Sequence, residues 1–113
     1  MILGQIDSYM KLCLQTWIFC ESCIYSEIST STPRRELVKE CHDCALACFA
    51  LVAKLANNQL EIGEQAFRCI IHCRQCQETC AKYAETEDIR CCGEICKRCA
   101  EQIKGIALEF NLN

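Results

Sequence analysis

The chain has 113 residues and a formal net charge of −3 at pH 7, and 51% of its residues are hydrophobic. That length fits a single domain over residues 1–113 with a modest core, and so high an apolar fraction excludes a disordered tail. The acidic balance gives no electrostatic footprint for nucleic acid, and no apolar stretch reaches the roughly 20 residues that span a bilayer. We therefore expect a soluble globular protein that binds neither nucleic acid nor membrane.

Four helices are predicted from the hydrophobic periodicity and the breaks between periodic segments, at residues 3–28, 34–56, 60–83 and 88–110. Between the first two helices, residues 29–33 read as a turn, with Thr32 placed to cap a helix whose first position is Pro33. Polar residues 84–88 form the last break, with Thr86 as the predicted cap of the last helix. Short loops between four helices predict an all-α fold, an antiparallel up-down four-helix bundle.

Cysteine is the most unusual component, because it supplies 14 of the residues. Secreted disulfide scaffolds have such a content but are loop-rich, whereas this chain has 4 Gly and 1 Pro. The N-terminal segment shows no basic region, apolar run or cleavage site of a secretion signal. The sequence thus favours a cytoplasmic protein whose thiols stay reduced.

Within each predicted helix, the cysteines recur mainly at intervals of three, four or seven residues, which places them on one helical face. The first helix carries Cys13, Cys20 and Cys23, the second Cys41, Cys44 and Cys48, the third Cys69, Cys73, Cys76 and Cys80, and the fourth Cys92, Cys96 and Cys99 with Cys91 alongside. The four faces are expected to line one shared, cysteine-lined core.

Each cysteine stripe changes from sulfur to hydrocarbon along its helix. Cysteines occupy the C-terminal halves of the first and third helices but the N-terminal halves of the other two, and an antiparallel bundle brings those halves to one end. Toward the other end the stripes continue as apolar residues, namely Ile6, Tyr9, Val52, Leu55, Ile62, Ala66, Ile103, Ile106 and Phe110. The pattern predicts a column of thiols that begins near the 29–33 and 84–88 loops and ends at an apolar plug.

Two structural explanations compete with a metal site. A buried cysteine can serve as a small apolar residue, and cysteines on different helices can form disulfides. Neither explains why 14 cysteines are sorted to one end. Zinc and iron–sulfur centres use four convergent thiolates, commonly on loops, whereas soft Cu(I) accepts two sulfurs and lets one thiolate bridge two ions. The pattern favours Cu(I) on all the cysteines, up to roughly 14 ions per chain.

The cysteine spacing resembles that of the copper storage proteins over the whole chain. The resemblance rests on the Cys-x3-Cys-x2-Cys runs at 69–76 and 92–99, the Cys-x2-Cys-x3-Cys run at 41–48 and the four-helix layout. It implies a bundle that binds many Cu(I) ions inside and often assembles as a homotetramer. Family members without an export signal are cytosolic, and a copper chaperone is a candidate delivery partner.

Three polar residues outside the cysteine stripes also have candidate roles. His72 lies next to Cys73 and is a candidate secondary ligand, although a boundary position explains it equally well. Glu27 lies near the loop end of the first stripe, where it could guard the mouth of the column or belong to a solvated helix end. Arg34 is predicted to lie in a solvated first helical turn.

No open coordination position is paired with an acid or base, so we expect copper storage rather than an enzyme. Two alternatives stay open. One is an iron–sulfur electron-transfer protein similar to ferredoxins. The other is a metal-free bundle with a redox-sensing or structural role.

Overall fold

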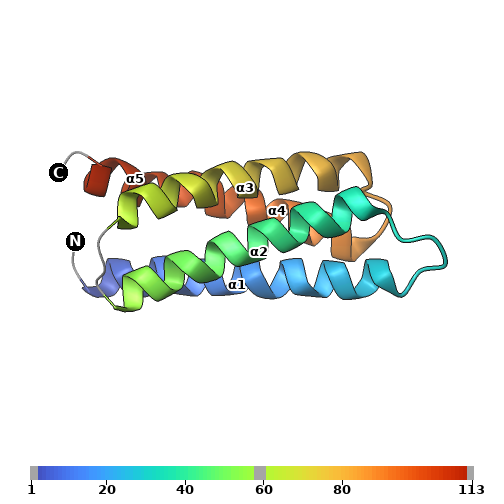
Figure 1. The fold of residues 1–113 in the computed structure, drawn as a ribbon, viewed down its shortest axis with the longest axis horizontal. Helices are drawn as coiled ribbons and strands as arrows, with labels where there is room; N and C mark the ends of the chain where they lie inside the picture. The colour runs from blue at the N-terminus through green and yellow to red at the C-terminus, as the bar shows by residue number, and fades with distance from the viewer. Residues whose placement is uncertain (1–2, 58–60, 112–113) are drawn as a thin grey trace.

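The computed structural model describes residues 3–57 and 61–111, which form helices joined by short loops (Figure 1). The helices are α1 (Leu3–Ile28), α2 (Arg35–Ala56), α3 (Ile62–Lys82), α4 (Glu87–Gln102) and α5 (Lys104–Asn111). Helices α1 to α4 run alternately in opposite directions, and each packs against two neighbours around one core. The result is the predicted all-α four-helix bundle with cysteines inside, 47 × 19 × 18 Å in extent.

The last predicted helix, residues 88–110, is divided in the structure. Helix α4 ends at Gln102 and α5 begins at Lys104, and the Ile106 N–H donates to the Ile103 carbonyl only three residues back, at 3.0 Å. Ile103 and Ile106 are both fully buried, so the apolar stripe continues across this tighter turn. The predicted start of the third helix at residue 60 and the side chain of Phe110 lie outside the described part of the chain.

The two predicted helix caps have different outcomes. Thr86 caps α4, because its hydroxyl accepts a hydrogen bond from the backbone N–H three residues later, at 3.3 Å. Thr32 and Pro33 lie outside α2, whose N-cap residue is Arg34 in an extended conformation. The predicted Thr32 cap was wrong because the Arg34 N–H donates instead to the Glu27 carboxylate at the end of α1, at 2.7 Å.

These caps lead to a stability prediction. The Thr86→Ala variant should lower the free energy of unfolding by about 1 kcal/mol, because an N–H at the start of α4 loses its acceptor. Chemical denaturation of the metal-free protein, followed by circular dichroism, measures the loss. Thr32→Ala serves as the matched control and should change nothing, since Thr32 caps no helix; equal losses in the two variants would contradict the assignment.

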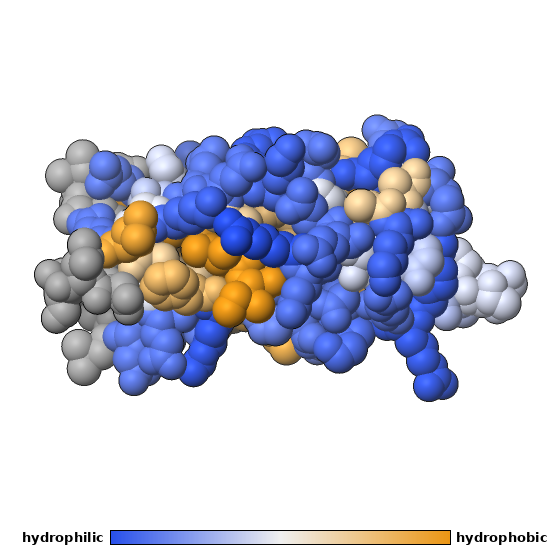
Figure 2. All heavy atoms as spheres, turned by 90° about the horizontal axis from the view of Figure 1, so that it is seen from above, coloured by the Kyte–Doolittle hydropathy of each residue, from blue (hydrophilic) through white to orange (hydrophobic). Residues whose placement is uncertain are grey.

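One face of the molecule is largely polar (Figure 2). In Figure 2, hydrophilic residues cover most of one face, and apolar side chains gather over the half away from the 29–34 loop. Large apolar side chains that are exposed include Leu46, Phe49, Phe67, Ile71 and Leu108. Trp17 packs its half-buried ring against Phe49, with 5.7 Å between ring centroids. None of the described helices is long and apolar enough to cross a membrane.

Candidate metal centre

Twelve of the cysteines converge in three groups of four, and within each group the four Sγ atoms lie within 4.8 Å of one another. The outer tetrad, nearest the loops that join α1 to α2 and α3 to α4, consists of Cys23, Cys41, Cys80 and Cys92. The middle tetrad consists of Cys20, Cys44, Cys76 and Cys96, and the deep tetrad of Cys48, Cys69, Cys73 and Cys99. All twelve side chains are buried.

The tetrads touch one another, so that sulfur forms a continuous column along the bundle. The Sγ atoms of Cys20 and Cys92 lie 3.8 Å apart and join the middle tetrad to the outer one. Cys44 and Cys73, 3.5 Å apart, join the middle tetrad to the deep one. Within the middle tetrad the Sγ atoms of Cys44 and Cys96 are 3.7 Å apart. Sulfurs of successive tetrads are thus as close as sulfurs within one.

All fourteen cysteines are free thiols. The shortest of these Sγ–Sγ separations, 3.5 Å, is far longer than a disulfide bond of about 2.05 Å. Hydrogen bonds among neighbouring thiols, together with burial, raise the pKa of Cys41, Cys48 and Cys96 well above the usual value of a thiol. These three thiols stay protonated when no metal ion is bound, so a metal ion that binds them must displace protons.

Cys13 extends the column beyond the tetrads. Its side chain is fully buried, and its thiol interacts with those of Cys48, Cys69 and Cys99 in the deep tetrad. Further along the bundle the interior becomes hydrocarbon, formed by Leu51, Leu55, Ile62, Ile103 and Ile106. The column is therefore closed at its deep end by an apolar plug, as the polarity of the stripes predicted.

Two predicted ligands lie apart from the column. Cys91 is half-buried and lines a surface groove between α1 and α4, beside Phe19 and Arg98. His72 lines another groove, between α2 and α3, beside Asp43. The His72 Nδ1 atom is buried and has no hydrogen-bond partner among the described residues. Neither side chain belongs to a tetrad.

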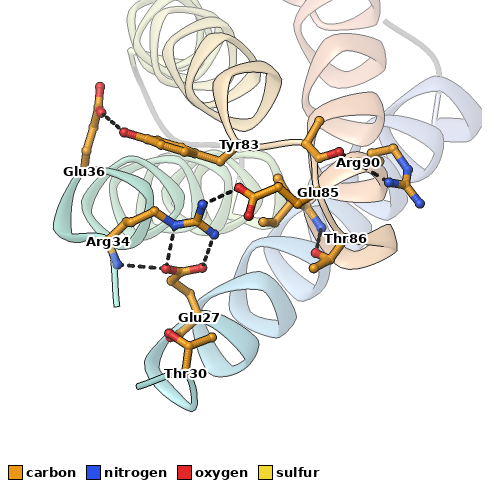
Figure 3. Close-up of polar contacts among 10 residues, drawn as sticks. Glu27, Thr30, Arg34, Glu36, Tyr83, Glu85, Thr86 and Arg90 are labelled. Atoms are coloured by element: carbon orange, nitrogen blue, oxygen red, sulfur yellow. Dashed lines mark hydrogen bonds and ion pairs between the residues drawn. The ribbon is translucent and has the colours of Figure 1, made fainter. Parts of the chain in front are cut away.

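A polar network joins the helix ends and loops at the end of the bundle nearest the outer tetrad (Figure 3). Arg34 donates from Nε and Nη2 to the two carboxylate oxygens of Glu27, both at 3.0 Å, and from Nη1 to Glu85. Its guanidinium group lies over the Tyr83 ring, 4.7 Å from the centroid. We call these four residues the latch. Arg34 therefore lies outside the first turn of α2 and joins the end of α1 to the α3–α4 loop, which the sequence did not predict.

The latch carries a pH-dependent contribution to stability. The hydrogen bonds from Arg34 lower the pKa of Glu27 below its usual 4.5. A carboxylate with a lowered pKa stabilises the fold above its unfolded-state pKa, and this contribution is lost as the pH falls through the lowered folded-state value. We expect Glu27→Gln to reduce the free energy of unfolding by about 1 to 2 kcal/mol at neutral pH.

Denaturation at pH 7 and at pH 3 tests this prediction. The difference between the wild type and Glu27→Gln should shrink at the lower pH, because the wild-type carboxylate becomes progressively protonated as the pH falls toward its lowered pKa. The control is Glu64→Gln, which removes the exposed i,i+4 partner of Arg68 and should cost less than about 0.5 kcal/mol. A difference that stays constant with pH would show that the ion pair does not contribute.

The sulfur column suits soft metal ions that bind singly among thiolates. Contacting Sγ atoms are 3.5 to 4.0 Å apart, and all four of each tetrad lie within 4.8 Å of one another, so a cubane of four irons and four sulfides has no room between them. A single ion does fit, since tetrahedral zinc with Zn–S bonds of about 2.3 Å has sulfur–sulfur edges of about 3.8 Å. The fold and site thus define a class: four-helix bundles with an interior column of metal-binding thiols.

Within that class the chain belongs to the copper storage protein family, whose sequence profile matches residues 4–107. The match confirms the resemblance that the cysteine spacing indicated. Comparisons with curated proteins and with solved structures found no match.

Proposed function

We propose that this chain is a cytosolic Cu(I) store without enzymatic activity, and that its core thiolates hold many ions. The observation that supports this most is the continuity of the sulfur column. Because Cys44 and Cys73 of successive tetrads are only 3.5 Å apart, one thiolate can bridge ions in both tetrads. With two sulfurs per ion and two ions per sulfur, the capacity approaches about one Cu(I) per column cysteine.

The proposed ligands are the thirteen buried cysteines, namely the three tetrads and Cys13. We propose that Cys91 and His72 hold no stored copper, because each lines a groove on the outside of the bundle. Copper would pass inward from the outer tetrad, since the apolar plug closes the other end.

Charge favours Cu(I) over divalent ions in this core. A zinc ion bound by four thiolates leaves two negative charges, and a buried charge without compensation is costly. Each Cu(I) instead replaces one thiol proton, so filling leaves the charge of the interior unchanged. Among the described residues, Glu27 is the one acidic residue in the buried class, and Arg34 already pairs with it. The interior is thus matched to a monovalent, thiophilic ion.

Anaerobic titration with Cu(I) against a competing chelator tests the function. Saturation near thirteen ions per chain would support storage, and saturation at zero to two would contradict it. A visible absorption band in anaerobically purified protein would favour the iron–sulfur alternative, because Cu(I) is d¹⁰ and its thiolates are colourless. A protein that binds no metal would leave the redox-sensing or structural alternative.

The cellular setting and partners are also proposed. The free thiols of the core need reducing surroundings, which the cytosol supplies. A copper chaperone is the proposed donor of Cu(I). The family resemblance implies a homotetramer, and the exposed apolar side chains of Leu46, Phe49 and Ile71 offer surface for contacts between subunits. Light scattering after gel filtration should then give a mass four times the 12.9 kDa of the chain; a monomer mass would exclude it.

A further inference from the structure

We propose that Arg34 is a gate over the sulfur column, and that Glu27 is the first protein ligand of an ion that passes this gate. The proposal rests on the proposed function, because it concerns how Cu(I) reaches the thiols. It assigns a role to two residues outside the cysteine column.

Glu27 occupies the layer directly above the outer tetrad. It follows Cys23 by four residues, so it lies one helical turn, about 6 Å, nearer the loop end. The side chain of Glu27 is only 3% exposed. Leu37 precedes Cys41 by four residues and Ile89 precedes Cys92 by three. Both buried side chains therefore also lie about one helical turn nearer the loop end than the outer tetrad. Glu27 thus brings a carboxylate into a layer whose other buried walls are apolar.

Arg34 occupies the position that an incoming cation would take. Its backbone N–H and its Nε both donate to Glu27 Oε2, at 2.7 and 3.0 Å, and its Nη2 donates to Oε1 at 3.0 Å. Both carboxylate oxygens are therefore engaged by a positive group. A cation approaching the outer tetrad is repelled by this guanidinium and finds no free oxygen.

The outer partners of Arg34 allow it to move without losing all its contacts. Glu85, an exposed residue, binds Nη1, and the ring of Tyr83 supports the guanidinium plane. Arg34 itself is 30% exposed and follows the exposed 29–33 loop. Its side chain can release Glu27 and stay paired with Glu85 at the surface, which makes Arg34 a better gate than a fully buried residue.

The exchange conserves charge and involves no redox step. Cu(I) replaces the guanidinium beside Glu27, so the carboxylate keeps one positive partner. A carboxylate is a poor ligand for a soft ion and thiolate a good one, so Cu(I) moves on to Cys23. A bond from copper to the Glu27 oxygen breaks, a bond to the Cys23 sulfur forms, and the Cys23 proton leaves to solvent.

The rate of copper uptake tests both roles. Metal-free protein is mixed anaerobically with Cu(I) held by a coloured chelator such as bicinchoninate, and the loss of chelate colour is followed. Arg34→Gln should take up copper about tenfold faster than the wild type. The activation barrier for uptake is then lower, because opening the gate no longer requires breaking a charge-assisted hydrogen-bonded pair. The double variant Arg34→Gln/Glu27→Gln should be slower than Arg34→Gln alone. The final copper number should be the same in all three.

Lys82→Gln is the matched control. It removes one positive charge at the same end of the bundle, where Lys82 pairs with Glu36 rather than Glu27, and should leave the uptake rate near that of the wild type. An unchanged rate in Arg34→Gln, or an equal acceleration in Lys82→Gln, would overturn the gate. A double variant as fast as Arg34→Gln would overturn the role of Glu27.

A second readout separates the gate from the storage function. A small neutral aromatic disulfide should react with the thiols of metal-free Arg34→Gln faster than with those of the metal-free wild type, and this result does not depend on how many copper ions the protein can bind. Equal reaction rates would refute the gate, whereas a wild type that binds few copper ions would refute storage alone. If Arg34→Gln loses helix content, Arg34→Lys is used instead; it keeps the charge but not the two-pronged contact, and should also react faster.

Discussion

Copper capacity should fall by about two ions in the double variant Cys73→Ala/Cys76→Ala, from roughly thirteen, because each bridging sulfur supports about one Cu(I). The two cysteines belong to the deep and the middle tetrads. Helix content should stay largely intact, since alanine favours helix and the apolar plug is untouched. Anaerobic titration measures the capacity, and far-ultraviolet circular dichroism measures the helix content.

Cys91→Ala is the control for this experiment. Its thiol lines the groove between α1 and α4, so its removal should leave the capacity unchanged. Loss of one ion in Cys91→Ala would place Cys91 among the ligands, as the sequence had predicted. If the double variant unfolds instead of losing copper, the cysteines of the column have mainly a structural role.

Copper loading should raise the midpoint of thermal unfolding by more than about 20 °C. An ion that binds only the folded state stabilises it by about 2.7 kcal/mol when its free concentration is 100 times Kd, and several bound ions add their contributions. For a domain of this size each kcal/mol corresponds to about 4 °C or more. Anaerobic melting curves at increasing copper-to-protein ratios measure the change.

Removal of copper by a strong chelator should return the midpoint to that of the metal-free protein. The Cys73→Ala/Cys76→Ala variant should gain less from copper than the wild type. A midpoint that does not depend on copper would mean that the ions bind outside the folded core, and would contradict storage in the sulfur column.

Much of the fold followed from the sequence because helical spacing is a local property. Cys41, Cys44 and Cys48 lie on one face of any α-helix, and the change from sulfur to hydrocarbon along four helices fixed which ends meet. The division into tetrads depends on how far each helix slides along its neighbours, which spacing alone does not determine. Cys91 carried a signal that could have separated it from the column, since it lies about 100° around the helix from Cys92.

The latch could not be predicted because its residues come from distant parts of the chain. The sequence predicted Thr32 as a cap because Thr32 directly precedes Pro33, and proline is common at the first position of a helix. In the structure, the Arg34 N–H donates to the Glu27 carboxylate, which therefore supplies the acceptor that the Thr32 hydroxyl was predicted to supply. Such a contact depends on the angle at which α1 and α2 leave their loop. Local patterns contain no information on that angle.

The apolar plug has a consequence for the order in which copper would leave. With Leu51 and Ile103 sealing the deep end, ions that bind near Cys48 can depart only after those nearer Cys23 have gone. The last ions to arrive would be the first to leave, as in a stack. A chelator should therefore remove copper in stages, a quick fraction from the outer tetrad and then slower fractions from the layers beneath it. Under the proposed function, such a protein would meet a small demand for copper at once while its deepest ions stay in reserve.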